Sequence, residues 1–206
     1  LLSVWLYHKP RARFLMYRIE RKLLAGKPVP VNDRTSVVLF TVNKAASMYV
    51  HRMLRWIAEP HGLLQADLTG WFATSSGNMF RHFKDPESMQ KLFRPKGFFY
   101  AALRDPCDIP GPERFRIVVV LRDPRDVLTS KYYSQGFSHA VINERVHARR
   151  KQVVQQTIDA FVLEHAPGLL KSYQRYVDQY DGKPHALITT YEKMIADLPG
   201  WLNTIV

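Results

Sequence analysis

Two segments of this chain share one pattern, in which a run of apolar and β-branched residues leads into a helix-like stretch. The first run, 36–42, has the length of a strand, and apolar residues recur at helical spacing from 47 to 59. The second run, 117–121, is followed by Asp123 and Pro124, which suit a helix N-cap and a first-turn proline. Strands that alternate with helices predict a mostly parallel sheet that is covered on both faces.

The remaining chain extends this α/β pattern. Further strands are predicted at 63–68, 98–103 and 186–190, and residues 69–96 are expected to be irregular or partly helical. Helices are predicted at 143–165 and 168–180, with a break at Pro167 and Gly168. We expect two parts, a basic N-terminal helix with its linker at 1–35 and an α/β domain at 36–206, with three layers in the order α/β/α.

Composition narrows the class of protein. The chain has 206 residues, of which 46% are hydrophobic, and this suits one soluble domain with a real core. The single Cys107 excludes an internal disulfide framework and a cysteine-rich zinc site. No apolar run reaches the length of about 20 residues that a membrane-spanning helix needs. We therefore expect a cytoplasmic protein.

The net charge of +12 predicts an anionic partner if the cations cluster. Much of the excess lies in 9–27 and 145–151. Segment 11–24 reads either as a basic amphipathic helix in peripheral contact with a membrane or as a solvated helix packed on the domain. Neither an RNA-binding motif with interleaved aromatic residues nor a paired-cysteine finger is present, so no nucleic-acid partner is expected.

The segment that follows the first strand has the features of an anion-binding loop. A helix N-terminus offers unpaired N–H groups and the positive end of the helix dipole. Lys44 adds an ammonium group, Ala45 and Ala46 allow close backbone approach, and Ser47 adds a hydroxyl donor. The pattern is not a Walker A motif. The alternative is an ordinary strand-to-helix turn with a surface lysine.

The segment that follows the second strand offers a second set of anion ligands. Arg122 stands at the end of the strand, and Ser130 comes eight residues later, about two helical turns on. A guanidinium and a hydroxyl on one side of a helix start can bind phosphate oxygens together. The alternative is a capped amphipathic helix whose arginine forms a salt bridge.

These segments resemble the sulfotransferases that use 3′-phosphoadenosine 5′-phosphosulfate (PAPS). The 3′-phosphate motif of that family, Arg-Asn-Pro-Lys-Asp-Val-x-x-Ser, is matched at its defining positions by 122–130. The 5′-phosphosulfate loop, Pro-Lys-Ser-Gly-Thr-Thr-Trp, is similar to the stretch from Lys44 to Tyr49, although Ala46 replaces the glycine and Met48 the second threonine. Tyr191-Glu192-Lys193-Met194 resembles the family's Tyr-Glu-Asp-Met segment. The resemblance covers 36–206.

The resemblance implies a P-loop NTPase-like fold and an enzyme that moves a sulfuryl group from PAPS to a hydroxyl or amine without a metal. Lys44 would also act in catalysis, and Tyr49 would lie where the family stacks adenine. The residues implied in PAPS binding are Lys44, Ala45, Ala46, Ser47, Met48, Tyr49, Arg122, Ser130 and Tyr191.

The base that takes the acceptor proton is less explicit. The histidine of the cytosolic branch is missing from the matching stretch, 100–103. Other branches place a glutamate just beyond the first helix, where this chain has Asp67, so Asp67 is the first candidate and His82 the second. The alternative for Asp67 is an N-cap for the stretch after Leu68.

Two other functions and several acceptors stay open. The chain could be a nucleotide-binding protein of this fold without transferase activity, or a nucleoside kinase-like P-loop enzyme. The acceptor could be a small molecule, a glycan, a lipid or a peptide, and the oligomeric state is open. The family's Gly-x-x-Gly-x-x-Lys loop is not in the sequence, and the chain starts with Leu1 rather than methionine, so it could be a fragment that lacks an N-terminal anchor or a C-terminal lid.

Overall fold

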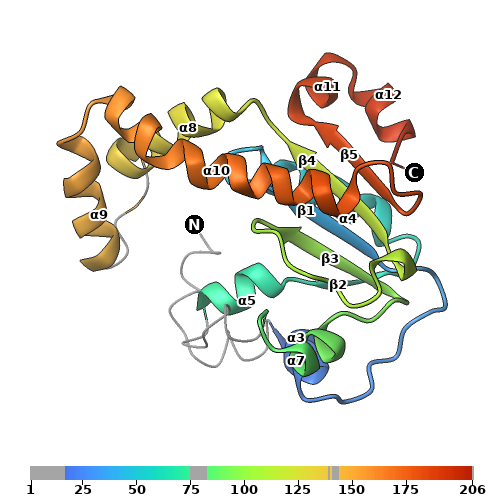
Figure 1. Ribbon diagram of the computed structural model, residues 1–206. Coiled ribbons are helices and arrows are strands. Elements are labelled where there is room, and N and C mark those ends of the chain that lie inside the picture. The colour runs from blue at the N-terminus through green and yellow to red at the C-terminus, as the bar shows by residue number, and fades with distance from the viewer. Residues whose placement is uncertain (1–16, 75–82, 139, 141–143, 206) are drawn as a thin grey trace.

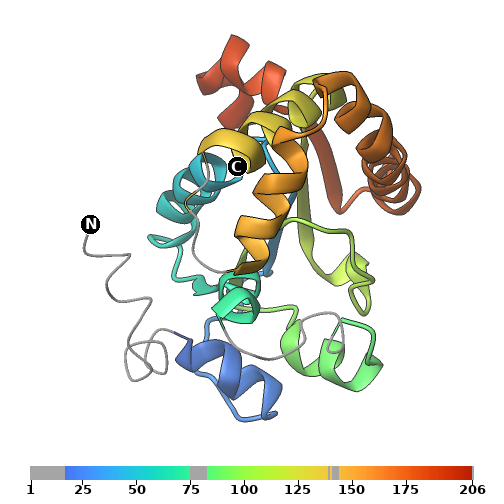
Figure 2. The same ribbon diagram turned by 90° about the vertical axis from the view of Figure 1, so that its left-hand side faces the viewer.

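The computed structural model describes residues 17–74, 83–138, 140 and 144–205, and Figure 1 shows their arrangement. His82 and residues 11–16 of the basic segment lie outside the described residues. The described part has a central sheet with helices on both faces (Figures 1 and 2). The predicted α/β/α architecture is confirmed.

The sheet has five strands in the order β2-β3-β1-β4-β5, and all four neighbouring pairs are parallel. The strands are β1 (Val37–Thr41), β2 (Leu64–Ala66), β3 (Phe98–Leu103), β4 (Arg116–Leu121) and β5 (Ala186–Thr190). After β1 the chain crosses to the β2 edge, and after β4 it crosses to the β5 edge. The connections therefore diverge between β1 and β4, which is where open parallel sheets bind ligands, outside the carboxyl ends of the strands.

The sheet divides the core into two layers because successive strand residues point to opposite faces. Val38 and Phe40 pack on one face with Tyr176 and Tyr180 of α10 (Ile158–Tyr180). Leu39, between them in sequence, packs on the other face with the apolar side chains of α4 (Ser47–Ala58). The same second face is covered by α11 (Tyr191–Ala196) and α12 (Leu198–Asn203) through Met194 and Trp201.

The remaining helices surround this frame. They are α3 (Arg18–Leu24), α5 (Leu68–Thr74), α7 (Pro86–Leu92), α8 (Pro124–Tyr133) and α9 (Glu144–Val154). A 3₁₀ turn spans Pro112–Arg114, and a π-helical turn, Ser134–Ser138, continues α8. Helices α5 and α7 confirm that part of 69–96 is helical.

The predicted helix break at Pro167 and Gly168 is wrong. Helix α10 runs through both residues, and the break falls earlier, between α9 and α10. Thr157 caps α10 by accepting the N–H of Ala160 at 3.2 Å. The exposed proline removes one backbone hydrogen bond, and a proline inside a helix costs about 3 kcal/mol. Buried Phe161 before it and buried Tyr176 after it hold the helix in one piece.

The described part of the basic N-terminal segment packs on the domain. Leu23 of α3 is fully buried in the main core, and α3 contacts α7. The carboxylate of buried Glu20 accepts the N–H of Asp67 at 2.6 Å. Burial raises the pKa of Glu20. Between the two interpretations of 11–24, these contacts favour the packed helix for the residues that are described.

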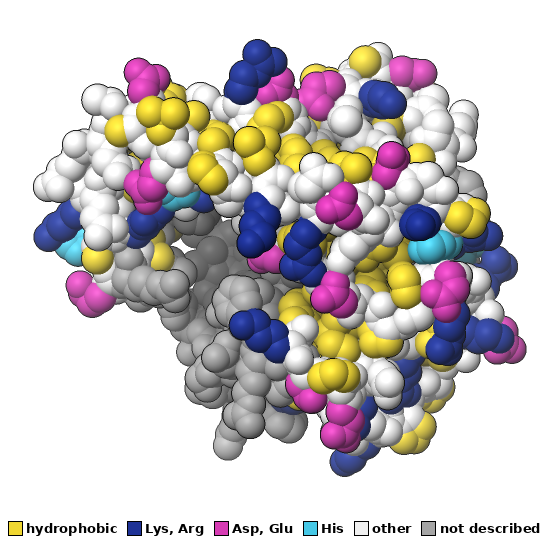
Figure 3. All heavy atoms as spheres, viewed as in Figure 1, with side chains coloured by type: hydrophobic (Ala, Val, Ile, Leu, Met, Phe, Trp, Pro, Cys, Tyr) yellow, Lys and Arg dark blue, Asp and Glu magenta, His cyan; other side chains and the backbone are white. Residues whose placement is uncertain are grey.

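Charged side chains are mixed on the face seen in Figure 3, where Lys and Arg are interspersed with Asp and Glu. Hydrophobic side chains gather over α10, of which Leu163 and Leu170 are the most exposed. Within the described residues, no helix combines the length and the apolar character that crossing a membrane requires.

Candidate nucleotide site

The loop between β1 and α4 has an unusual backbone. Lys44 and Ala46 have φ angles of 71° and 53°, in the left-handed region that favours glycine. Ala46 is the N-cap of α4 and gives it no side-chain cap. Within the described residues, the N–H groups of Ala46, Ser47 and Met48 donate to no other group. The helix therefore begins with unpaired donors, as an anion site requires.

Lys44 extends into a cavity of about 580 Å³ next to this loop. Its Nζ donates to Oγ of Ser134 at 2.5 Å. Burial lowers the pKa of Lys44, and the nearby guanidinium of Arg104 lowers it further. An ammonium that is crowded by a second cation is poised to bind an anion. The side chains and loop residues around this cavity are Asn43, Lys44, Ala46, Ser47, Met48, Tyr49, Arg104, Lys131, Ser134 and Gln135.

Arg122, after β4, lies against the same loop from the neighbouring strand. Its Nη1 donates to the carbonyl oxygen of Lys44 at 2.9 Å. Its Cζ lies 4.6 Å from the centre of the Tyr191 ring, within cation–π range. Nη2 pairs with Asp126 at 3.1 Å, so the salt-bridge alternative is present as well. Nε is buried and has no partner among the described residues.

The backbone around Arg122 is fixed by several polar contacts. Asp123 caps α8 by accepting the N–H of Arg125 at 2.8 Å, which confirms the predicted cap. The N–H of Asp123 donates to Glu192 at 2.9 Å and so joins this segment to the Tyr191 segment. Tyr173 of α10 donates its hydroxyl to the carbonyl of Arg122 at 2.6 Å. Three segments that are far apart in sequence therefore meet at one place.

The other predicted ligands occupy different positions in the site. Ser47 lines the cavity and is 7% exposed, whereas Ala45 is fully buried below the loop. Met48 and Tyr49 also line the cavity and are half-exposed. Ser130, on α8, is partly buried but is not among the residues that line the cavity. The structure therefore brings the lysine loop, Arg122 and Tyr191 together, with Ser130 on the adjoining helix.

Asp67 acts as an N-cap for the helix after it, which was the alternative to its prediction as a base. Its carboxylate accepts the N–H of Gly70 at 2.8 Å, at the start of α5. Asp67 follows β2, and β3 separates that strand from β1. Asp67 is not among the residues that line the Lys44 cavity. The structure therefore gives Asp67 a structural role, and its role as a base stays a prediction.

Sequence analysis missed several residues of the cavity. Arg104 directly follows β3, as Arg122 follows β4, so a cation at the end of a buried strand was a signal that could have found it. Lys131 and Ser134 lie on α8 and the turn that continues it. Burial lowers the pKa of Lys131, and the nearby Arg149 lowers it further. Lys131 directly follows Ser130, so the sequence indicates a cation that raises the potential of the second anion-binding segment, but not that it lines the Lys44 cavity.

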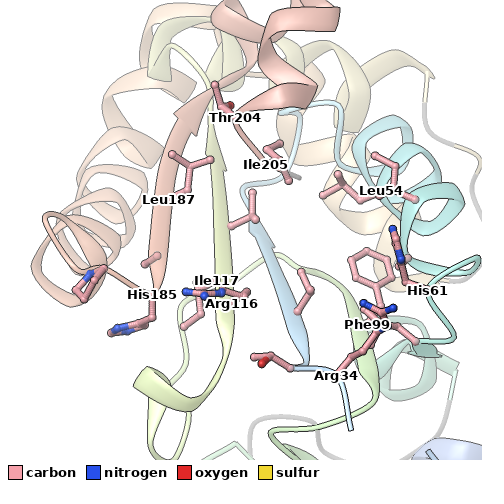
Figure 4. A pocket seen from close by; sticks show the side chains of 18 of the residues that line it. Arg34, Leu54, His61, Phe99, Arg116, Ile117, His185, Leu187, Thr204 and Ile205 are labelled. Atoms are coloured by element: carbon pink, nitrogen blue, oxygen red, sulfur yellow. The ribbon is translucent and has the colours of Figure 1, made fainter. Parts of the chain in front are cut away.

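A larger cavity, of about 680 Å³, lies at the opposite end of the sheet (Figure 4). Its walls combine apolar side chains such as Leu54, Phe99 and Leu187 with polar ones, including Arg34, His61, Arg116 and His185. These residues surround the amino ends of the strands, where Val37 and Ala186 begin β1 and β5. Among the described residues that line it, none belongs to a loop that leads from a strand into a helix, as the Lys44 loop does. We therefore assign the candidate site to the smaller cavity.

The residues that the structure describes contain no group of three or more His, Cys, Asp or Glu side chains placed to hold a metal ion. Cys107 is buried, and burial raises the pKa of its thiol. Its thiol is therefore kept protonated and plays no visible part in the site.

Comparisons with known proteins agree with this geometry. Residues 112–206 match the family model described as "Sulfotransferase domain". A search of curated proteins finds no sequence match. Among solved structures, mouse sulfotransferase SULT7A1 complexed with PAP is similar at 14% identity and a TM-score of 0.57, covering 93% of this chain and 64% of that one. Retinol dehydratase in complex with androsterone and the inactive cofactor PAP is similar at 17% identity and a TM-score of 0.50, covering 89% and 61%.

The chain thus spans less than two thirds of the length of either structure. The structural likeness establishes the fold, and the family model covers the part that contains Arg122, Ser130 and Tyr191. These matches confirm the predicted resemblance of this chain to the sulfotransferase family, whose domain model covers residues 112–206.

Proposed function

We propose that this chain transfers a sulfuryl group from PAPS to a hydroxyl or amine of an acceptor molecule. One observation carries the proposal. The Arg122 guanidinium donates to the carbonyl of Lys44, 78 residues earlier, at the carboxyl ends of the adjacent strands β1 and β4. Two cationic segments therefore border one place at the divergence of the sheet, as a nucleotide with phosphates at both ends requires.

Each end of the nucleotide has a proposed set of ligands. Lys44, Ser47 and the unpaired N–H groups at the start of α4 hold the 5′-phosphosulfate. Arg122 and Ser130 hold the 3′-phosphate, and the adenosine lies between Tyr49 and Tyr191. Ala45, Ala46 and Met48 contribute through the backbone of the loop. The mouse sulfotransferase and the retinol dehydratase, both solved with PAP, support a bound nucleotide of this type.

The transfer is a displacement at sulfur. The acceptor oxygen or nitrogen forms a bond to sulfur while the bond between sulfur and the bridging phosphate oxygen breaks. The bond's electron pair stays on that oxygen, and Lys44 stabilises the developing charge. The proton of the acceptor passes to a base, for which Asp67 and His82 are the proposed candidates. The products are a sulfated acceptor and adenosine 3′,5′-bisphosphate (PAP), and no metal takes part.

A second function is favoured by one specific observation. Asp67 is engaged as the cap of α5 and does not line the Lys44 cavity. A protein with this fold could therefore bind the nucleotide without transferring sulfate. Transfer of radiolabelled sulfate from PAPS to a panel of phenol, steroid, glycan, lipid and peptide acceptors distinguishes the two functions, because only an enzyme forms product.

The donor site is tested by Arg122→Ala with isothermal titration calorimetry. We expect the affinity for PAP to fall by about 10-fold or more, since a charge-assisted hydrogen bond to the 3′-phosphate is lost. The affinity for AMP, which has no 3′-phosphate, should change by much less. Equal losses for both nucleotides would remove Arg122 from the 3′-phosphate site.

Arg125→Ala is the matched control for this experiment. Arg125 is on the same helix start, but its side chain is 87% exposed and pairs with Asp123. Both nucleotides should bind this variant about as well as the unchanged protein. A thermal melt of each variant shows whether the fold is intact.

A further inference from the structure

The cavity beside Lys44 holds more positive charge than the proposed donor contacts use. Three cations line it, Lys44, Arg104 and Lys131, and no carboxylate is among its lining residues. None of the three forms an ion pair with a described residue. Asp105 lies close enough to interact electrostatically with Arg104 and Lys131 but pairs with neither. The cavity therefore contains more cations than the proposed contacts to the donor require.

Arg104 is poorly satisfied in this position. Its Nε is buried and has no hydrogen-bond partner among the described residues. Its Nη2 meets only the sulfur of Met48, a weak acceptor, at 3.4 Å. A guanidinium that lacks strong acceptors is a ready binding group for an anion, since buried donors without partners cost free energy.

Lys131 forms no ion pair within the described residues, although the carboxylates of Glu164 and Asp105 lie near enough to act on it electrostatically. Its ammonium lies 6.0 Å from the centre of the Phe161 ring, at the limit of a cation–π contact. Arg149 acts on it from α9 and is itself in contact with Gln135, another residue of the cavity. Repulsion between these cations costs free energy that a bound anion would relieve.

The donor does not account for Arg104 and Lys131. The proposed 3′-phosphate ligands approach Lys44 from β4, where Arg122 meets its carbonyl and Tyr191. Arg122, Ser130 and Tyr191 are not among the residues that line the cavity. Arg104 enters it from β3, and Lys131 enters it from α8 beside Ser134. The two cations thus line a cavity beside Lys44 that the proposed 3′-phosphate ligands do not line, and we place the acceptor in this cavity.

We infer that the acceptor is itself an anion, a hydroxylated molecule with a carboxylate, phosphate or sulfate group that Arg104 and Lys131 bind. The inference rests on the proposed function, since it names the substrate class of the same site. The half-exposed side chain of Met48 lines the cavity next to these cations and offers contact to an apolar or ring-shaped body. The recognised acceptor therefore combines a ring or chain with a negative group.

The test compares two fluorescent probes that differ in one charge, 6-hydroxy-2-naphthoic acid and 2-naphthol. Each is titrated into the protein saturated with PAP, and into the protein without nucleotide. The naphthoate should bind at least about 10-fold more tightly than the naphthol, as expected for charge-assisted hydrogen bonds. In R104Q/K131Q the difference should shrink to less than about 2-fold, and each single variant should lose part of it.

R116Q/K193Q is the matched control, because it removes the same net charge from two exposed positions outside this cavity. It should keep the preference for the naphthoate. Equal binding of the two probes to the unchanged protein would overturn the inference, and so would an equal loss of preference in both double variants, since the effect would then be long-range charge alone.

PAP binding separates this inference from the proposed function. If R104Q/K131Q weakens PAP by about 10-fold or more, the two cations belong to the donor site, and the inference fails while the donor assignment stands. If the unchanged protein does not bind PAP, the proposed function fails, and the probe titrations without nucleotide still report whether the cavity prefers an anion.

Discussion

The two ends of the sheet differ in the volume of their cavities, in the charges that line them and in backbone conformation. The amino end has the larger cavity, about 680 Å³, which is bordered by two arginines and by Asp33, and the carboxyl end has a cavity of about 580 Å³ with three cations and no carboxylate. At the amino end, the turns that lead into β2, β3 and β5 place glycines, Gly62, Gly97 and Gly182, at positive φ. At the carboxyl end, Lys44 and Ala46 adopt positive φ without being glycine.

This difference shows that cavity size alone does not locate a site. Turns at the amino end use the residue that adopts positive φ without steric cost. The Lys44 loop accepts strain of about 1 kcal/mol or more per residue, which proteins retain mainly where geometry serves a function. At the strained end, the Lys44 ammonium and the residues with unpaired N–H groups line one cavity, and the described residues of the other end show no such arrangement.

The largest effect should come from removing the ammonium at the carboxyl end. Lys44→Ala is expected to lower kcat/KM for sulfate transfer by about 10² to 10³-fold, since charge on the leaving oxygen loses its stabilising partner. Arg116→Ala removes a cation that borders the amino-end cavity and should leave transfer unchanged. Comparable losses in both variants, measured with radiolabelled PAPS, would end the distinction between the two cavities.

Asp67→Asn tests how far the active region extends toward β2. Asparagine is as good an N-cap as aspartate, so the cap of α5 should survive while a carboxylate base is lost. If Asp67 is the base, turnover falls by about 10²-fold or more with PAP affinity retained. Turnover close to that of the unchanged protein would leave Asp67 as a cap only and direct the search to His82.

Asp67→Ala completes the pair, because it removes both base and cap. Its free energy of unfolding should fall by about 1 kcal/mol relative to Asp67→Asn. Denaturant titration followed by circular dichroism measures this difference. A free energy of unfolding equal to that of Asp67→Asn would show that the contact to Gly70 contributes little.

The smallest effects on the protein should come from exchanging alanine and glycine at positive-φ positions of the two ends. Ala46→Gly removes a left-handed alanine and should raise the free energy of unfolding by about 0.5 kcal/mol, a net gain after the entropy cost of glycine. Gly182→Ala does the reverse at φ 67°, where a Cβ meets no atom within 4 Å, and should lower it by about 1 kcal/mol. Destabilisation by Ala46→Gly would show that the loop is not strained.

Local sequence signals predicted many elements well because they act within a few residues. Both 98–103 and 186–190 are strands as predicted, since a buried parallel strand reads as a short apolar run. Asp123 with Pro124 predicted a helix start that the structure confirms. The break at Pro167 was wrong because packing at Phe161 and Tyr176, which lie on either side, outweighs a local preference.

The site was only partly predictable for the same reason. Lys44 and Arg122 each carry a local signature, a cation between a strand and a helix start. Two roles were predicted for Asp67, base and N-cap, and the contact to Gly70 supports the cap, while the role as a base stays a prediction. Arg104 and Lys131 become neighbours of Lys44 only when β3 and α8 are placed beside β1.

The sequence by itself determined the approximate positions of the five strands, the helix starts at Ser47 and Pro124, and the two segments that are predicted to bind anions, because propensity, capping and apolar periodicity are properties of neighbouring residues. Tertiary structure decided the strand order, which sets β4 against β1 and so brings the Arg122 guanidinium to the carbonyl of Lys44. It also decided which cations gather at the carboxyl end of the sheet. Contacts across 78 residues depend on how whole layers pack, and no local pattern encodes them.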